Sequence, residues 1–130
     1  MIGTTIGRYK IVERLGAGGM GEVFRAEDTT LGRPVALKFL AGHLLNDDEA
    51  KQRFLREARA AAALHHPNIC TVYEIDEVDG QIFIVMAYVD GENLTEPVAR
   101  GPMELAEVLT IAIQLAEGLR EAHGTGIIHR

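Results

Sequence analysis

The feature that most constrains this chain is a run rich in glycine, residues 16–21, placed between two strand-like segments. Residues 9–15 alternate in polarity before the run, and residues 22–26 have strand character directly after it. The same glycine spacing occurs in dinucleotide-binding folds of nicotinamide-dependent oxidoreductases, but there a helix follows the glycines. A strand in that place predicts a β-hairpin whose tip exposes backbone N–H groups, which suit phosphate binding.

Further strands are expected at residues 35–40, 69–75 and 81–88, with Asp79-Gly80 as the tight turn between the last two. Between them, Asn46 and Glu49 resemble a capping box that opens a helix over residues 47–64, with Phe54, Ala58 and Ala61 at helical spacing. These elements predict a five-stranded antiparallel sheet with one helix, an α+β arrangement.

Two charged residues are predicted on otherwise apolar surfaces. Lys38 shares one face of its strand with Ala36, while Leu37 and Phe39 point to the other face. Glu57 falls on the apolar stripe of the predicted helix. A charge near an apolar surface is costly without a partner, so we expect Lys38 and Glu57 to form an ion pair. Two alternatives remain for this ion pair: it could be purely structural, or its lysine could also bind phosphate oxygens.

The pattern changes after residues 88–92. A short helix is expected at residues 94–99 and a long one at residues 104–123, which carries an apolar stripe of period 3.6 that indicates core packing rather than a membrane face. We therefore expect a lead-in at residues 1–8, a small lobe at 9–89 and the start of a larger, incomplete lobe at 90–130.

Taken in order, several segments resemble the signatures of the protein kinase family. They are Gly16-Ala17-Gly18-Gly19-Met20-Gly21-Glu22-Val23, Val35-Ala36-Leu37-Lys38, Glu57, His66-Pro67-Asn68-Ile69, Ile84-Val85-Met86-Ala87-Tyr88-Val89 and Ile127-Ile128-His129-Arg130. The Gly-Gly-Met-Gly form of the loop is similar to bacterial serine/threonine kinases of the eukaryotic-like type. The resemblance covers about residues 8–130.

This resemblance implies ATP binding and transfer of the γ-phosphoryl group to Ser or Thr hydroxyls of a protein substrate. It implies catalytic roles for Lys38, which contacts the α- and β-phosphates, and for Glu57, which holds Lys38. The implied ATP-binding positions are Leu15, Gly16, Ala17, Gly18, Gly19, Met20, Gly21, Val23, Ala36, Lys38, Met86, Ala87, Tyr88 and Val89. Among these, Val23 and Ala36 enclose the adenine, and the backbone of Ala87 and Val89 contacts its edge. Asp90, Glu92 and Asn93 are alternatives for the ribose.

The resemblance also implies what these 130 residues lack. His129-Arg130 matches the beginning of the motif His-Arg-Asp, so the catalytic base and the magnesium ligands of the family fall beyond Arg130. We expect the chain alone to be inactive, and a pseudokinase or an ATP-binding scaffold module remains the alternative function.

Charge and composition disfavour other classes of function. Thirteen Lys and Arg against nineteen Asp and Glu give a net charge of -6, which disfavours nucleic acid as a partner. No apolar run is long enough for a membrane span, no set of residues has metal-ligand spacing, and the single Cys70 is expected to be buried and inert. We expect a cytoplasmic kinase domain.

Overall fold

The computed structural model describes residues 1–19 and 21–128, which form two compact units. The first unit consists of Met1–Ala63 and Thr71–Tyr88, and the second of Leu64–Cys70 and Val89–Arg130. The segment at 64–70 groups with the C-terminal part of the chain, although it lies between elements of the first unit in the sequence.

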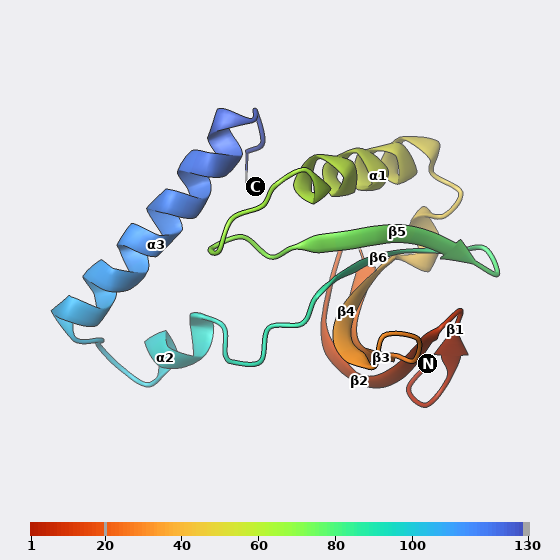
Figure 1. Cartoon of the computed structure of the whole chain (residues 1–130), viewed down its shortest axis with the longest axis horizontal. Coiled ribbons are helices and arrows are strands. Elements are labelled where there is room, and N and C mark those ends of the chain that lie inside the picture. Colours follow the sequence, from red (N-terminus) through yellow and green to blue (C-terminus); the bar gives the residue numbers. More distant parts are fainter. Residues whose placement is uncertain (20, 129–130) are drawn as a thin grey trace. The chain divides into compact units, whose positions relative to one another are not determined.

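The first unit is a curled antiparallel sheet with one α-helix (Figure 1). Its strands are β1 (Thr5–Ile6), β2 (Tyr9–Gly18), β3 (Gly21–Asp28), β4 (Arg33–Leu40), β5 (Val72–Val78) and β6 (Gln81–Ala87), in the spatial order β1-β2-β3-β4-β6-β5. The prediction of five strands was wrong by one, because the two-residue β1 pairs with β2 inside the expected lead-in. Its pattern is too short to show a strand period.

Strand β2 bends because its register against β3 shifts twice, between Ile11 and Glu13 and again between Arg14 and Gly16. Bulges of this kind increase the local twist of a strand. The turn between β5 and β6 confirms its prediction, since both Asp79 and Gly80 adopt the positive φ angles that a two-residue hairpin needs.

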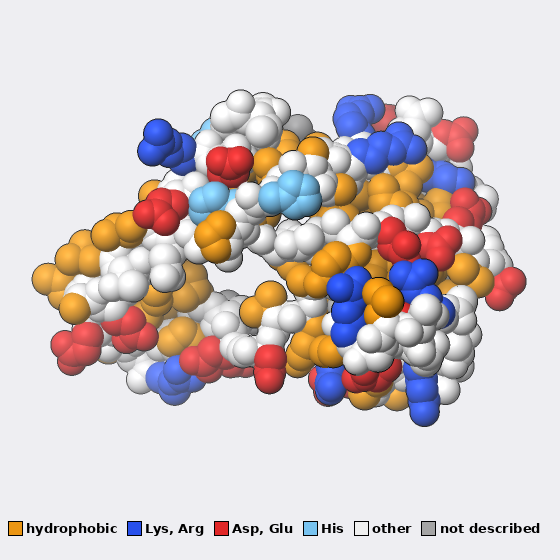
Figure 2. All heavy atoms as spheres, viewed as in Figure 1, with side chains coloured by type: hydrophobic (Ala, Val, Ile, Leu, Met, Phe, Trp, Pro, Cys, Tyr) orange, Lys and Arg blue, Asp and Glu red, His pale blue; other side chains and the backbone are white. Residues whose placement is uncertain are grey.

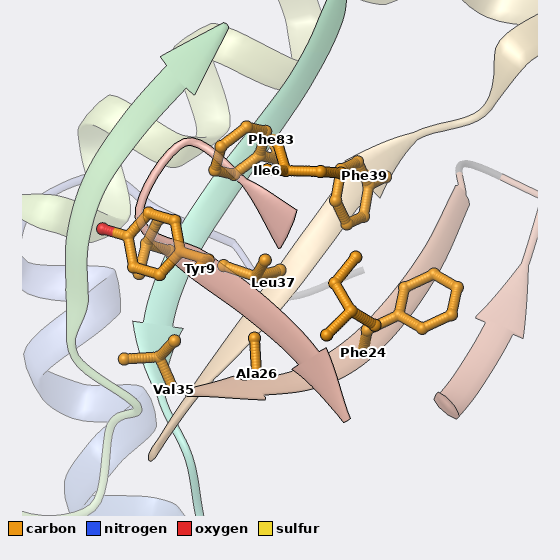
Figure 3. Close-up of a cluster of buried hydrophobic side chains, with 10 residues drawn as sticks. Ile6, Tyr9, Phe24, Ala26, Val35, Leu37, Phe39 and Phe83 are labelled. Carbon is orange, nitrogen blue, oxygen red and sulfur yellow. The ribbon is translucent and has the colours of Figure 1, made fainter. Parts of the chain in front are cut away.

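One face of the sheet is covered by an aromatic core, drawn in Figure 3. Tyr9 and Phe83 meet edge to face with 6.0 Å between ring centroids, and Phe39 lies 5.2 Å from Phe83. The predicted alternation in β4 is confirmed, because Leu37 and Phe39 belong to this core. The core consists of Ile6, Tyr9, Ile11, Phe24, Ala26, Val35, Leu37, Phe39, Phe83 and Val85.

The other face carries helix α1 (Asp48–Ala62), which lies along β5 in Figure 1 and buries Phe54 and Ala58 against Leu40, Ile82 and Ile84. A short 3₁₀ helix, η1 (Gly42–Leu44), leads into it. The N-cap of α1 is Asp47 rather than Asn46, because the Asp47 carboxylate accepts the N–H of Ala50 at 3.1 Å.

A buried carboxylate stabilises the end of β3. Asp28 is 1% exposed and accepts the N–H groups of Thr30 and Leu31, each at 3.0 Å, together with the guanidinium of Arg8 at 3.3 Å. Burial alone would raise the pKa of Asp28, but the two backbone donors and Arg8 outweigh it, so this pKa lies below its usual value. Asp28 therefore remains a charged acceptor that stabilises the turn before β4.

The second unit contains α2 (Thr95–Ala99) and α3 (Leu105–Gly124). Asn68 donates its side-chain amide to the carbonyl of Gln114 at 3.0 Å, and a Cβ on Gly118 would stand 3.2 Å from the Asn68 carbonyl. The 64–70 segment is thus packed against α3. Cys70 is exposed, so the expectation that it would be buried was wrong.

Much of the predicted apolar stripe of α3 is exposed, and Figure 2 shows apolar side chains along this helix. The described part of the chain has no helix that is both long enough and apolar enough to cross a membrane.

Candidate functional site

The register of the first unit brings together, on one face of the sheet, residues that lie far apart in the sequence. Gly16 pairs with Val23 and Val23 with Lys38, so these three form one row across β2, β3 and β4. Ala36 pairs with Met86 of β6 in the neighbouring row. Opposite residues of antiparallel strands point to the same side, so Val23, Ala36, Lys38 and Met86 share the face that also carries α1.

The glycine hairpin is the edge of this face. Gly18 pairs with Gly21, and Arg14 of β2 forms an ion pair with Glu22 of β3 at 3.1 Å. Leu15 lies within a bulge of β2 and is 44% exposed, and Ala17 is also exposed. Met20 lies outside the described residues.

The glycines of this hairpin are not equivalent. Gly21 has a φ of +153°, and a Cβ there would stand 1.7 Å from the carbonyl oxygen of Phe39, so the fold itself requires glycine. A Cβ at Gly16, Gly18 or Gly19 would meet nothing within 4 Å, and none of the three has a positive φ. Their lack of side chains therefore opens the hairpin surface without serving the packing.

Lys38 is half-buried between Val23 and Ile84 in its row. No carboxylate of the described residues lies within ion-pair distance of its ammonium group. A half-buried ammonium beside apolar neighbours is a position where an anion would be favourable.

The ion pair predicted between Lys38 and Glu57 is not formed in this structure. Helix α1 buries Ala50, Phe54 and Ala58, and Glu57 is exposed. At about 100° per residue, Glu57 projects to the opposite side of Phe54 from Ala58, at the margin of the buried face. The predicted apolar stripe included this margin of the helix. The prediction that Glu57 faces inward was therefore wrong.

The end of β6 leads to the boundary between the units. Ala87 donates its N–H to the carbonyl of Thr71 at 2.9 Å, so a ligand contact at Ala87 would use its carbonyl oxygen, which can accept more than one hydrogen bond. Tyr88 is half-buried and is the last residue of the first unit. Val89, the first residue of the next stretch of the second unit, is 71% exposed.

Of the three alternatives for a ribose contact, two already have hydrogen-bond partners. Glu92 forms two hydrogen bonds with the guanidinium of Arg100, at 2.7 and 2.9 Å, and the side-chain oxygen of Asn93 accepts the N–H of Thr95 at 3.0 Å. Asp90 is exposed and makes no ion pair with the described residues.

Other kinds of ligand site do not coincide with the predicted ATP-binding residues in the described part of the chain. No group of three or more His, Cys, Asp or Glu side chains among residues 1–19 and 21–128 could hold a metal ion. The surface hollows of the second unit, one beside His66 and Arg120 and one beside Val98 and Met103, are lined by none of the predicted ATP-binding residues.

Missed by the sequence reasoning was Arg25. It follows Val23 by two positions in β3 and pairs with Ala36, so it rises from the same face as the predicted site. Its guanidinium lies over the ring of Tyr88. The alternation of β3 could have placed Arg25 on this face, but its contact with Tyr88, the residue directly after β6, depends on the order of the strands in the sheet.

Comparison with known proteins gives a consistent result. Residues 9–130 match the protein kinase domain family. The chain is 44% identical over 132 residues to serine/threonine-protein kinase PrkC of Bacillus subtilis, a match that covers 100% of this chain and 20% of that protein. It is 42% identical to serine/threonine-protein kinase pkn3 of Myxococcus xanthus, covering 99% of this chain and 24% of that one.

Among solved structures, the kinase domain of Mycobacterium tuberculosis PknI superimposes with a TM-score of 0.83 at 38% to 39% identity, covering 100% of this chain and 53% to 54% of that chain. The chain therefore spans roughly a fifth to a quarter of the curated relatives named here and about half of this kinase domain. The glycine hairpin, the lysine row, the family match and the shared fold agree, and the chain belongs to the protein kinase family.

Proposed function

We propose that this chain is the ATP-binding portion of a serine/threonine protein kinase. The observation that carries the proposal is Lys38, a half-buried ammonium that no described carboxylate neutralises, in one row with Val23 and Gly16. An anionic ligand on this face would meet both the ammonium and the open backbone of the hairpin. Phosphates of a nucleotide satisfy both requirements.

In this proposal, the phosphates lie under the hairpin formed by Gly16, Ala17, Gly18, Gly19, Met20 and Gly21, with Leu15 at its base. Lys38 binds phosphate oxygens, and Val23 and Ala36 provide the apolar surface for the adenine. Met86 lines the same surface, because it pairs with Ala36 across β4 and β6. Bound ATP would supply the phosphoryl group, with a protein Ser or Thr hydroxyl as the acceptor.

The adenine edge is assigned to backbone groups. Tyr88 separates the Ala87 carbonyl from the Val89 N–H, and these two groups would accept from and donate to the adenine. Asp90 is the favoured ribose contact, because Glu92 and Asn93 already have partners. Glu57 would serve as the partner of Lys38 only in a conformation in which α1 presents it toward the sheet.

The test of the proposal is the Lys38→Met substitution in the full-length protein that contains this chain. Methionine keeps most of the apolar volume, so the fold should persist while ATP-dependent phosphorylation of a protein substrate falls by more than about 100-fold. Lys10→Met is the matched control, since Lys10 is an exposed lysine of β2, and it should leave turnover unchanged. Unchanged turnover in Lys38→Met would refute the role of Lys38.

The adenine assignment has its own pair of variants. Val89→Pro removes the backbone N–H, whereas Val89→Ala keeps it and trims the side chain only. We expect ATP affinity to fall strongly in the proline variant and to change little in the alanine variant. Equal ATP affinity in both would show that the N–H of residue 89 does not bind the nucleotide.

The same measurements separate an active kinase from a pseudokinase. Residues 1–130 include no aspartate after His129-Arg130, so we expect them to transfer no phosphate by themselves. In the full-length protein, ATP binding without phosphoryl transfer would favour the scaffold alternative.

A further inference from the structure

The face of the sheet that carries the proposed site also carries Arg25, a charged side chain to which the proposed function assigns no role. Arg25 of β3 pairs with Ala36 of β4, and Ala36 pairs with Met86 of β6, so Arg25 rises beside the apolar surface assigned to the adenine. Its side chain is 32% exposed. It is therefore only partly accessible to solvent, beside the surface assigned to the adenine.

Three groups hold the guanidinium of Arg25. Its terminal nitrogens lie 3.7 Å from the carboxylate of Glu13 and 3.4 Å from that of Glu27. Its central carbon lies 5.2 Å from the centroid of the Tyr88 ring, within the range of a cation–π interaction. The Nε atom of Arg25 is buried and has no hydrogen-bond partner among the described residues. The packing of this side chain therefore leaves one donor unsatisfied.

The contact with Tyr88 matters because of where this residue lies. Tyr88 is the last residue of the first unit, and its two backbone torsions set the angle between the Ala87 carbonyl and the Val89 N–H. A ring held against a fixed guanidinium has fewer accessible torsions than a free one. Restriction of this kind lowers the cost of presenting both groups to a ligand.

We propose that Arg25 is a positioning residue for adenine recognition: through Tyr88 it holds the backbone around residue 88 in the orientation that binds the adenine edge. This inference rests on the proposed ATP-binding function. Arg25 itself touches no nucleotide in the proposal. Its effect should therefore appear as discrimination between bases rather than as loss of phosphate binding.

A matched control exists in the same sheet. Arg33 of β4 lies over the ring of Tyr73 in β5, with 4.1 Å from its central carbon to the ring centroid. Its Nε atom is likewise buried without a described partner. Arg33→Met thus removes the same kind of interaction from the first unit without touching Tyr88.

The experiment measures the KM values for ATP and GTP in the full-length protein and in Arg25→Met. We expect the KM for ATP to rise about threefold, in line with the usual strength of a cation–π contact, while the KM for GTP stays the same. The ATP preference should fall by that factor, stay at the parental value in Arg33→Met, and recover in part in Arg25→Lys. An unchanged preference in Arg25→Met, or an equal rise of both KM values, would overturn the proposal.

A second variant keeps the test decisive if Arg25→Met does not fold. Tyr88→Leu should lower the ATP preference to the same extent, and adding Arg25→Met to it should lower the preference no further. An unchanged preference in Tyr88→Leu, or fully additive losses, would refute the coupling. If the parental protein binds neither nucleotide, the proposed function fails instead, so the two failures are distinct.

Discussion

The two units of this chain differ in how completely each buries its apolar residues. Among the described residues, the largest fully buried side chains all lie in the first unit: Tyr9, Phe83, Ile11, Leu37, Val35, Val85 and Asp28. In the described part of the second unit, the buried positions are Leu64, Gly118 and Ala122. Its exposed large apolar residues are Val89, Leu94, Val98, Leu105, Val108, Leu109, Ile113, Leu115, Leu119 and Ile128.

Because of this difference, an unusual side chain can indicate a site in the first unit but not in the second. In the first unit most apolar side chains of the sheet are buried, so two features are exceptions: the half-buried Lys38, which pairs with no described carboxylate, and three glycines that packing does not require. The proposed ligand site rests on these exceptions. In the second unit exposed apolar residues are the rule, and no single exposed residue indicates a site. Exposed apolar surface on this scale is uncommon on soluble monomers.

The largest expected effect on stability comes from truncating an aromatic side chain in the core of the sheet. Phe83 is 0% exposed and contacts Tyr9 and Phe39, so Phe83→Ala should lower the free energy of unfolding by about 3–5 kcal/mol. Ile113 of α3 is 58% exposed, and Ile113→Ala should change the free energy of unfolding by no more than about 0.5 kcal/mol. Urea unfolding of both variants measures the contrast.

Similar losses in these two variants would contradict the comparison, because they would mean that α3 contributes to a core as much as the sheet does.

The fold of the first unit could largely be predicted, because its signals are local. The alternation in β4 placed Leu37 and Phe39 on the buried side, and Asp79-Gly80 marked the hairpin. The strand missing from the prediction, β1, could not be predicted, since its two residues become a strand only by pairing with β2. Its existence depends on tertiary structure rather than on local pattern.

The candidate site was predictable as a set of residues but less so as a set of contacts. Strand register brought Val23, Ala36, Lys38 and Met86 to one face, as the period of two implies. The partner of Lys38 was not predictable in the same way. A residue three positions from Phe54 can lie inside or outside the buried stripe, and the packing of α1 leaves Glu57 exposed.

A smaller effect on stability is expected from two glycines of the hairpin, one required by the fold and one by the proposed nucleotide site. Gly21→Ala places a Cβ against the Phe39 carbonyl and should lower the free energy of unfolding by more than about 1 kcal/mol. Gly18→Ala has space and an ordinary φ, so it should leave unfolding unchanged or slightly improved while weakening nucleotide affinity. Thermal melts and ATP titrations of both variants test this, and equal melting temperatures would refute the assignment of Gly21.

The buried carboxylate of the first unit predicts a pH effect. The pKa of Asp28 is lowered in the folded state, so its contribution to stability is present above its usual pKa near 4 and is lost as the pH falls through the lowered value. Asp28→Asn should reduce the melting temperature at pH 7, and the difference from the parent should shrink below about pH 4. A difference that stays constant down to pH 2 would show that charge is not what Asp28 contributes.

The smallest effect is expected for the corresponding carboxylate of the second unit. Hydrogen bonds from Arg100 lower the pKa of Glu92, so the direction of this shift is the same as for Asp28. Both partners are exposed, however, with 45% of the Glu92 side chain and 62% of the Arg100 side chain accessible, and solvent and salt screen such pairs. Arg100→Gln should therefore return the pKa of Glu92 toward its ordinary value in an NMR titration without a measurable change in melting temperature. A loss of melting temperature as large as that of Asp28→Asn would contradict the comparison, because a solvent-exposed ion pair would then stabilise the second unit as strongly as a buried carboxylate stabilises the first.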